Sequence, residues 1–579
     1  MATKERISQI FEKIYGNGGD ALLKGFLREL DEKKALWNFP PQEPGWYKDL
    51  TVYSLYVDLF NKDFKGLENK LDYLNDLGVS CLWLLPILDS PLRDAGFDIR
   101  DYRKIRPELL AGGKQDEVFG SFLNKAHSLG IKVLFDIAVN HTSDEHPWFL
   151  QAKSAKDNPY RDFYIWSDDE GKYSGARVIF EGIETSNWKK CGDEYYFHRF
   201  FDFQPDLNYR NPKVLLEMSR NFLFWLEKGV DGFRVDAIPY LWKEEGTNCE
   251  NLPMTHNIVK FFRAVVDYVR PNTLLLAEAC QKPVEVVKYF GGGDECHAGY
   301  HFPLMPQIYK MMKMQDFTPV TETLDEKVTP SIGGESQWFT FLRCHDELSL
   351  ELVYVSEDDR RYIHQNYCKE PLWDFRKGQG ISARLAELMD RNPDKIALIF
   401  SIMLTLPGTP VIYYGDEFGK LNDLDYYREQ IKATGKDDTR FLVRGHIDWP
   451  KLEQDLKDES TLSFKVYSRL RQMLKARSQT KVFGRGSLEW LDFKDKNGNA
   501  QKDVLAFYRE FEGEKYLLIH NLSGETREVS PEGLELSNLL PQINKAAFDF
   551  AAKTLKLAPY GYYWLRLANS SSGFHKRLI

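Results

Sequence analysis

The sequence lacks the long apolar runs that a membrane requires. No uninterrupted apolar stretch approaches the ~20 residues with which a helix crosses a bilayer. The N-terminal segment MATKERISQIFEKI has no apolar core of the kind that a secretory signal carries. We therefore expect a chain without a membrane partner and without an export signal.

Cysteine and excess basic charge are also scarce. The 579 residues include seven cysteines, and no two of them form a C-x-x-C pair, so neither a zinc knuckle nor a disulfide framework is predicted. The net charge of -9 argues against nucleic acid as a partner, because nucleic-acid binding needs clustered basic surface. The few, scattered cysteines favour a reduced, cytoplasmic setting.

What the sequence has instead is a regular alternation of short apolar runs with longer helical patterns. Such runs are typical of strands that helices bury on both faces. Eight runs in order favour an α/β protein with a closed (β/α)8 TIM barrel over an open, doubly wound sheet, the alternative that spacing leaves open. The runs are Thr51–Val57, Cys81–Leu85, Ile131–Ala138, Val230–Asp236, Thr273–Glu278, Gly299–Leu304, Trp338–Arg343 and Pro410–Gly415.

Breaks in this alternation divide the chain. Clustered prolines end an N-terminal pair of amphipathic helices. The polar stretches after the third and seventh runs are too long for plain barrel loops. Past residue 480, short alternating runs predict an antiparallel β-sandwich. The expected units are an N-terminal helical extension and linker (1–45), a catalytic barrel (46–141 and 206–480), a loop subdomain inserted after strand 3 (142–205), a lid-like insertion after strand 7 (347–381), a C-terminal β domain (481–568) and a flexible tail (569–579).

Polar residues gather where the predicted strands end, which in a barrel is the side that carries the active site. A single aspartate there is usually a helix cap, but four strand ends carry such residues. Arg234 and Asp236 lie two apart on one strand, so they point to the same side and the arginine can hold the carboxylate charged. The residues concerned are Asp136, Asn140, His141, Arg234, Asp236, Glu278, His345 and Asp346.

This inventory favours cleavage of a glycosidic bond. The reaction needs one carboxylate to attack the anomeric carbon and one carboxylic acid to protonate the departing oxygen. Asp236 and Glu278 end neighbouring strands and should lie close together, as a retaining mechanism requires. Asp346 would raise the pKa of the acid and bind sugar hydroxyls. A metal site made of the two histidines and Asp136 suits these residues less well.

Four segments resemble the conserved regions of the α-amylase superfamily, and they occur in the same order. They are DIAVNH (136–141), GFRVDAIPY (232–240), LLAEA (275–279) and FLRCHDEL (341–348). The resemblance implies Asp236 as nucleophile, Glu278 as general acid/base and Asp346 as the carboxylate that stabilises the transition state. It also implies that the first sugar is held by His141, Arg234 and His345.

Three further positions follow from the same resemblance. GFDIRDY (96–102) is similar to a family segment whose aspartate binds the first sugar, which implies Asp98. Arg444 stands where one branch of the family has an arginine that pairs with this aspartate. QPDLN (204–208) is similar to a region typical of that branch, which adds Gln204 to the substrate-binding residues.

Longer segments outside the catalytic core resemble the trehalose synthase branch of the superfamily. Examples are HRFFDFQPDLNYRNP (198–212) and GGGDECHAGYHFPLMP (291–306). This resemblance implies retaining glucosyl transfer, with maltose isomerised to trehalose through a covalent glucosyl-enzyme. Hydrolysis or transglycosylation of maltose, isomaltose or sucrose is the alternative, and a non-catalytic sugar-binding protein is a third. Residues 355–379, on the expected lid, depart from the trehalose synthase pattern.

The resemblance implies no required cofactor. Residues 60–66 lack the Asp-rich calcium loop of many relatives. A second calcium position of the family remains open, with Asn140, Asp206 and a backbone carbonyl near Tyr240 as ligands, although Lys243 puts a positive charge nearby. The expected partner is a small α-glucoside, and a homo-oligomer is left open.

Overall fold

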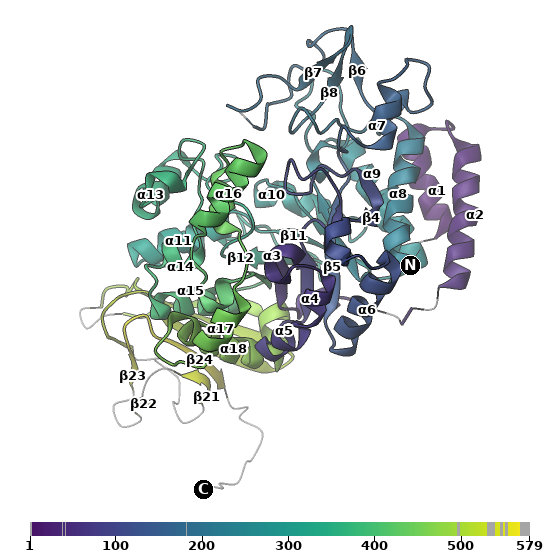
Figure 1. Cartoon of the computed structure of the whole chain (residues 1–579). Coiled ribbons are helices and arrows are strands. Elements are labelled where there is room, and N and C mark those ends of the chain that lie inside the picture. Colours follow the sequence, from purple (N-terminus) through teal and green to yellow (C-terminus); the bar gives the residue numbers. More distant parts are fainter. Residues whose placement is uncertain are drawn as a thin grey trace.

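The computed structural model contains a closed barrel of eight parallel strands (Figure 1). It describes residues 3–37, 39–40, 42–180, 182–494, 498–529, 539–544, 548–549 and 554–567. The barrel strands are β1 (Val52–Leu55), β2 (Cys81–Leu84), β5 (Lys132–Ala138), β9 (Gly232–Asp236), β10 (Leu274–Ala277), β11 (Ala298–Tyr300), β12 (Gln337–Phe341) and β16 (Thr409–Tyr413). Because β16 pairs with β1, no edge remains open. The predicted TIM barrel is confirmed, and the doubly wound alternative is wrong.

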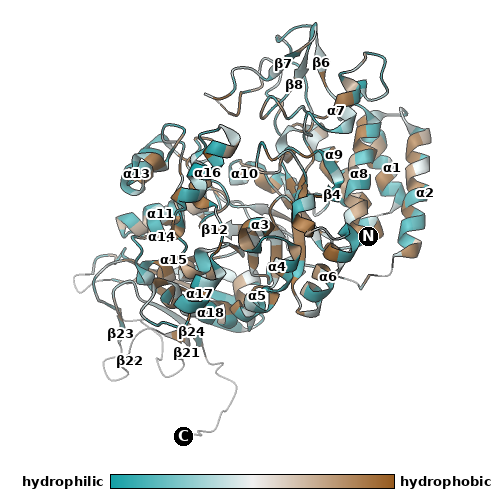
Figure 2. Cartoon of the chain, viewed as in Figure 1, coloured by the Kyte–Doolittle hydropathy of each residue, from teal (hydrophilic) through white to brown (hydrophobic). Residues whose placement is uncertain are grey.

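Amphipathic helices surround the barrel. Figure 2 shows their ribbons banded in teal and brown, as expected of helices with one face on the core and one in water. In α8, Asn211 caps the N-terminus and Pro212 takes the first helical position, where its missing N–H is not needed. The longer helices of this layer are α5 (Leu71–Leu77), α6 (Gln115–Ser128), α8 (Pro212–Glu227), α9 (Pro253–Val269), α11 (Leu304–Met314), α15 (Pro393–Thr405) and α18 (Leu462–Ser478).

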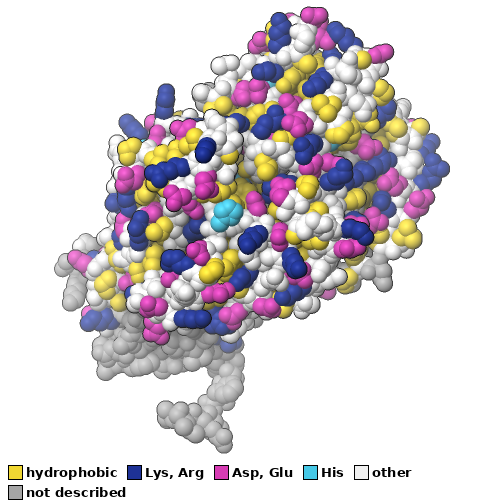
Figure 3. Space-filling model, viewed as in Figure 1, with side chains coloured by type: hydrophobic (Ala, Val, Ile, Leu, Met, Phe, Trp, Pro, Cys, Tyr) yellow, Lys and Arg dark blue, Asp and Glu magenta, His cyan; other side chains and the backbone are white. Residues whose placement is uncertain are grey.

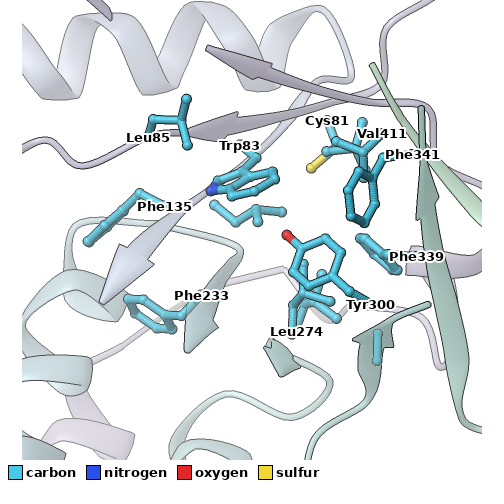
Figure 4. Close-up of a cluster of buried hydrophobic side chains, with 14 of the residues drawn as sticks. Cys81, Trp83, Leu85, Phe135, Phe233, Leu274, Tyr300, Phe339, Phe341 and Val411 are labelled. Carbon is cyan, nitrogen blue, oxygen red and sulfur yellow. The ribbon is translucent and has the colours of Figure 1, made fainter. Parts of the chain in front are cut away.

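Large aromatic side chains fill the barrel interior. The rings of Trp83 and Tyr300 lie 5.6 Å apart between centroids, and the Phe341 ring lies 5.6 Å from that of Tyr300. Figure 4 shows these three rings together, with Val411 of the closing strand beside Phe341, whereas Phe135 and Phe233 point outward and contact Trp225 and Phe222 of α8. Since this layer of rings is solid, a ligand at the barrel mouth rests on an apolar floor.

The N-terminal helices α1 (Lys4–Tyr15) and α2 (Asp20–Leu36) pack on the outside of the barrel, beside α8 and α9 (Figure 1). Phe11 and Phe26 both contact Phe261 of α9, with ring centroids 5.9 and 6.3 Å apart. The two helices therefore extend the barrel core sideways.

The segment 142–205 leaves the barrel after β5 and folds on itself. It contains α7 (Pro147–Ala152) and an antiparallel sheet of β6 (Trp166–Ser167), β8 (Glu194–Phe197) and β7 (Trp188–Cys191). Its small core includes Trp188, Phe197 and Tyr173, together with Cys249 from the segment after β9. A shared core of this kind ties the insertion to the barrel on its pocket side.

A second insertion follows β12. It consists of β13 (Leu348–Ser349), α13 (Glu357–Tyr367), β14 (Asp374–Phe375) and β15 (Gly380–Ile381), and the strands form one antiparallel sheet in the order β13-β15-β14. The pairing of β13 with β15 brings both ends of the insertion back to the barrel.

The C-terminal part is antiparallel β structure, as predicted. One sheet has the order β17-β18-β19-β24-β21 and the other β20-β23-β22. Buried residues of both sheets, such as Leu517 of β19 and Leu555 of β23, share one apolar cluster, so the sheets face each other. The bounds are β17 Ser487–Leu491, β18 Val504–Phe511, β19 Glu514–Asn521, β20 Arg527–Val529, β21 Leu539–Asn544, β22 Phe548–Asp549, β23 Thr554–Leu557 and β24 Tyr562–Leu567. The expected tail, 569–579, lies outside the described residues.

The surface carries charges of both signs. On the face in Figure 3, acidic and basic side chains are interspersed. Within the described part of the chain, every helix is too short or too polar to span a bilayer.

Candidate active site

A pocket opens where the barrel strands end. Its wall combines residues that follow β5, β9, β10 and β12 with residues of both insertions. The lining residues that matter for the chemistry are Asp94, Phe97, His141, Phe180, Arg234, Asp236, Glu278, His345, Asp346, Glu347, Arg376, Arg440 and Arg444. The residues that were predicted to share one mouth are thus largely brought together.

Arg234 fixes the expected nucleophile. Its Nη1 donates to Asp236 Oδ1 at 2.6 Å and to Asp136 Oδ1 at 2.5 Å. Asp136 is itself held by the Trp83 indole, whose Nε1 donates to its other oxygen at 2.7 Å. Burial opposes the charge on Arg234, but the two aspartates outweigh burial and raise its pKa well above the usual value. Asp236 is therefore oriented by a permanent cation.

Glu278 lies directly beside Asp236. Its backbone N–H donates to Val235 O at 3.0 Å, which continues the pairing of β10 with β9. Its Oε2 accepts the Ala237 N–H at 3.1 Å, and Ala237 has the left-handed backbone (φ 57°) that aims this N–H. Burial raises the pKa of Glu278 to about 7, with the Arg234 charge opposing and the Asp236 charge adding. Glu278 can therefore carry a proton near neutral pH, as a general acid must.

Asp346 has the opposite electrostatic environment. Its Oδ2 is 3.0 Å from His345 Nε2, and its Oδ1 is 3.1 Å from Arg440 Nη1 and 3.4 Å from Arg444 Nη2. Burial alone would raise the pKa of Asp346, but His345 and the two arginines hold it well below the usual range. The site thus contains one carboxyl group that favours its proton and another that favours its charge.

Two histidines present unused ring nitrogens. His141 Nε2 and His345 Nδ1 are buried and have no hydrogen-bond partner within the described structure. Phe97 stacks on His345, with 5.7 Å between ring centroids. Buried polar atoms rarely go unpaired, so these nitrogens are suited to the hydroxyl groups of a sugar lying on the ring of Phe97.

Asp98 and Gln204 do not reach the pocket. The Asp98 carboxylate is fully buried and accepts hydrogen bonds from Ser90 Oγ and from the backbone of Arg93 and Asp94. Gln204 Nε2 donates to Asp94 Oδ2 at 2.9 Å, and it is Asp94 that lines the cavity. Both residues therefore support the loop that carries Asp94, because their polar atoms are already used there.

The expected pair of Asp98 with Arg444 is not formed. Asp98 is 3.6 Å from Arg93 Nε, whereas Arg444 Nε donates to His345 O at 3.0 Å and its Nη2 contacts Asp346. Arg444 does line the pocket, so it stays a candidate for substrate binding by another route than the one predicted.

Among the pocket residues that were not predicted from the sequence, three lie close to predicted ones along the chain. Asp94 and Arg440 each lie four residues before a predicted residue, and Glu347 directly follows one. Burial raises the pKa of Asp94 to about 6 and that of Glu347 to about 7. Arg440 pairs with both Asp346 and Asp438. The available signal was their nearness to the motifs, but nearness alone does not say which neighbour points inward.

The residues expected to hold calcium do not fit that ion. Lys243 Nζ is 2.8 Å from Asn140 Oδ1 and 2.7 Å from Asp206 Oδ2. An ammonium group thus stands among the oxygens that the calcium would need, and calcium requires six to eight oxygen ligands. The third expected ligand was a backbone carbonyl near Tyr240; the hydroxyl of Tyr240 lies apart from this site and accepts a hydrogen bond from Arg177 at 3.4 Å. The calcium prediction is corrected: the local cation is a side chain.

Comparison with known proteins identifies the family. Residues 48–451 match the family described as "Alpha amylase, catalytic domain". The chain is 38% identical to a trehalose synthase/amylase of Mycobacterium tuberculosis, over 92% of each chain. It is 40% identical to a trehalose synthase of Thermus thermophilus, over 84% of this chain and 51% of that protein.

Solved structures agree in fold. A trehalulose synthase has a TM-score of 0.68 at 23% identity and covers 90% of this chain and 100% of its own. An α-amylase from H. orenii gives 0.68 at 24% identity, over 90% and 99%. With a matched catalytic domain over most of the chain and an intact set of carboxylates at the barrel mouth, the chain belongs to the α-amylase family.

Proposed function

We propose that this protein is a retaining glucosyl-transfer enzyme that isomerises maltose to trehalose. The observation that carries the chemistry is the contrast between Glu278, whose pKa burial raises to about 7, and Asp236, which Arg234 holds with a hydrogen bond of 2.6 Å. One group can give a proton to a leaving oxygen while its neighbour attacks the anomeric carbon.

The reaction has two steps through one intermediate. Asp236 forms a bond to the anomeric carbon of the non-reducing glucose, the glycosidic C–O bond breaks, and Glu278 protonates the departing glucose. That glucose then turns, and its anomeric hydroxyl attacks the glucosyl-enzyme while Glu278 takes the proton back. The ester bond to Asp236 breaks, and the product has the same atoms as the substrate.

Retention of the freed glucose separates isomerisation from hydrolysis, because water attack on the intermediate yields two glucose molecules. The two insertions meet over the pocket in a way that supports retention. The Arg376 guanidinium, from the second insertion, lies 4.4 Å from the ring centroid of Phe180, from the first, and 4.8 Å from Phe375. Such a cation–π contact holds the two covers together.

The choice of isomerase over hydrolase rests on the relatives. Several trehalose synthases match most of this chain at 38–40% identity. An α-amylase of Dictyoglomus thermophilum and an oligo-1,6-glucosidase of Heyndrickxia coagulans also match, the first at 29% identity and the second over 33% of the chain. Hydrolysis of α-glucosides is therefore the second candidate.

The working environment follows from the cysteines. All seven are free thiols. Because free thiols persist in reducing compartments, we propose a reduced, cytoplasmic setting. We propose a small α-glucoside as the partner.

Incubation with maltose separates these functions. We expect trehalose to exceed free glucose when the products are resolved by chromatography. Glucose as the sole product would favour the hydrolase, and no turnover would favour a non-catalytic sugar-binding protein.

The variant Asp236→Asn tests the nucleophile. It should lower turnover of maltose by at least about a thousandfold, because the neutral amide cannot attack the anomeric carbon as the carboxylate does. Circular dichroism and the melting temperature should stay near those of the parent. Turnover close to the parent's would contradict the assignment.

A further inference from the structure

Three chain segments meet behind the pocket at one buried ammonium group. Asn140 follows β5, Asp206 directly follows the first insertion, and Lys243 follows the short helix η4 (Ile238–Tyr240) after β9. The Lys243 side chain is 2% exposed and that of Asp206 0%. The Lys243 Nζ atom lies 2.7 Å from Asp206 Oδ2 and donates a hydrogen bond to Asn140 Oδ1 at 2.8 Å.

We propose that Lys243 is a built-in cation that takes the place of a bound metal ion and joins the first insertion to the barrel. A buried carboxylate needs a compensating charge, since an unpaired one is strongly destabilising. Lys243 supplies that charge to Asp206 through an ion pair, and its ammonium group is part of the barrel chain. Unlike a bound metal ion, this cation cannot dissociate from the protein, and chelators cannot remove it.

The neighbouring charges leave this task to Lys243. Arg199 is the other buried cation nearby, but its guanidinium contacts Glu250 and the carbonyl of Asn248. Arg199 reaches Asp206 through its backbone N–H alone, at 2.8 Å to Oδ1. Within the described structure, Lys243 is thus the cation whose charged group contacts Asp206.

Through the same contacts, Lys243 acts as a positioning residue for the pocket. Asn140 Nδ2 is 3.4 Å from His141 Nδ1, and His141 and Asp206 form a backbone bridge. The free His141 Nε2, which faces the proposed sugar site, is held by groups that Lys243 holds. This part of the inference rests on the proposed function. The link that Lys243 makes between the first insertion and the barrel, called the joint below, does not.

The parent protein gives the first test, without any variant. Its melting temperature should not change when EGTA is added, nor when millimolar CaCl₂ replaces the chelator. Elemental analysis of the purified protein should find far less than one calcium per chain. A melting temperature that falls in EGTA and recovers with calcium would overturn the proposal.

Substitution gives the second test. Lys243→Met keeps the length of the side chain and removes the charge, so the melting temperature should fall by about 5 °C or more. Lys243→Arg keeps the positive charge and should therefore keep most of the parent's melting temperature. Lys190→Met, at an exposed lysine of the same insertion, is the matched control and should melt as the parent does. Equal melting of Lys243→Met and the parent would overturn the proposal.

Conversion to a metal site gives a gain of function. In Lys243→Glu, two carboxylates face each other with Asn140, so the variant should melt lower than the parent without calcium and regain stability as CaCl₂ is titrated. Isothermal titration calorimetry should detect calcium binding to this variant and not to the parent. Calcium binding to both would overturn the proposal.

The positioning role has its own readout. If His141 is displaced, Lys243→Met should raise KM for maltose more than it lowers kcat, at a temperature where the variant stays folded. An unchanged KM would contradict the positioning role and leave the joint to the melting data. A parent without turnover would count against the proposed function, whereas the calcium and melting results would still decide the joint.

Discussion

The guanidinium of Arg234 lies between Asp136 and Asp236 because strand geometry puts it there. Arg234 and Asp236 are two residues apart on β9, and Asp136 lies opposite Arg234 on β5. One cation thus serves a structural carboxylate and the proposed nucleophile together. Close by, Glu278 and Asp346 have opposite proton affinities. Burial favours the protonated form of both, but at Asp346 the charges of His345 and two arginines outweigh burial and lower the pKa.

At this scale we predict the pH dependence of turnover. Glu278 must be protonated to act as an acid, and burial raises its pKa to about 7. The protonated fraction falls above that pKa, so kcat/KM for maltose should decline as the pH rises through about 7. The measurement is a pH–rate profile of the parent between pH 5 and 9. A flat profile from pH 6 to 9 would be inconsistent with this assignment.

Glu347 needs a control in the same experiment, because its pKa is also raised to about 7. The variant Glu347→Gln should keep the alkaline decline, whereas Glu278→Gln should have too little activity to titrate. Loss of the decline in Glu347→Gln would transfer it to that residue.

Among the elements, the two insertions both contribute to the wall of the pocket. Arg376 and Lys377 both have left-handed backbone (φ 47° and 54°), a conformation that non-glycine residues adopt at some cost. The turn that carries them directs the Arg376 guanidinium to the Phe180 ring. The contact joins segments that are far apart in the sequence and would close the space where glucose has to turn.

Arg376→Ala is therefore expected to loosen the cover. The ratio of free glucose to trehalose formed from maltose should rise roughly fivefold, the factor that a cation–π contact of about 1 kcal/mol represents. Arg361→Ala, at an exposed arginine of α13 in the same insertion, should leave the ratio unchanged. Equal ratios in both variants would show that the contact between Arg376 and Phe180 does not control retention of glucose.

The N-terminal helices are held by apolar contacts rather than by the linker. Phe26 of α2 is fully buried and its ring lies 6.3 Å from that of Phe261. Phe26→Ala should lower the free energy of unfolding by about 3–5 kcal/mol, the usual cost of emptying such a site. Urea denaturation measures this. Leu36→Ala, at the 81% exposed end of α2, should be close to neutral, and a similar loss in both variants would argue against the packing explanation.

For the whole molecule, Asp231 connects several elements at the opposite end of β9 from the pocket. Its carboxylate accepts hydrogen bonds from Gln42 of the linker, Lys132 of β5 and Arg270 after α9, and it is 2.7 Å from His127 of α6. Burial would raise the pKa of Asp231, but His127 and the two cations outweigh it and lower the pKa.

This connection predicts an acid-sensitive fold. Because the folded pKa of Asp231 lies below its unfolded value of about 3.9, the group contributes stability above that value and loses it as the pH falls through the lowered pKa. Asp231→Asn should melt several degrees lower than the parent at pH 7. The difference should shrink between about pH 4 and pH 2. A difference that is constant with pH would show that the lost charge is not the cause.

The sequence by itself determined the barrel and its catalytic carboxylates. Buried parallel strands have to be apolar along their whole length, so eight such runs are visible without any structure. Asp236 and Glu278 end two of those runs, and a barrel brings the carboxyl ends of all strands to one mouth. Local pattern was therefore enough for these residues.

The tertiary structure alone decided the contacts between distant segments. Asp346 pairs with Arg440 and Arg444. Gln204 donates a hydrogen bond to Asp94, although it was expected to bind sugar. Lys243 occupies the place where calcium was expected. Most of these contacts join loops that are about a hundred residues apart in the chain. Lys243 and Asp206 are nearer in the chain, but no motif fixes the directions of their side chains. No local pattern specifies which buried charge will meet which, because that choice is made by packing.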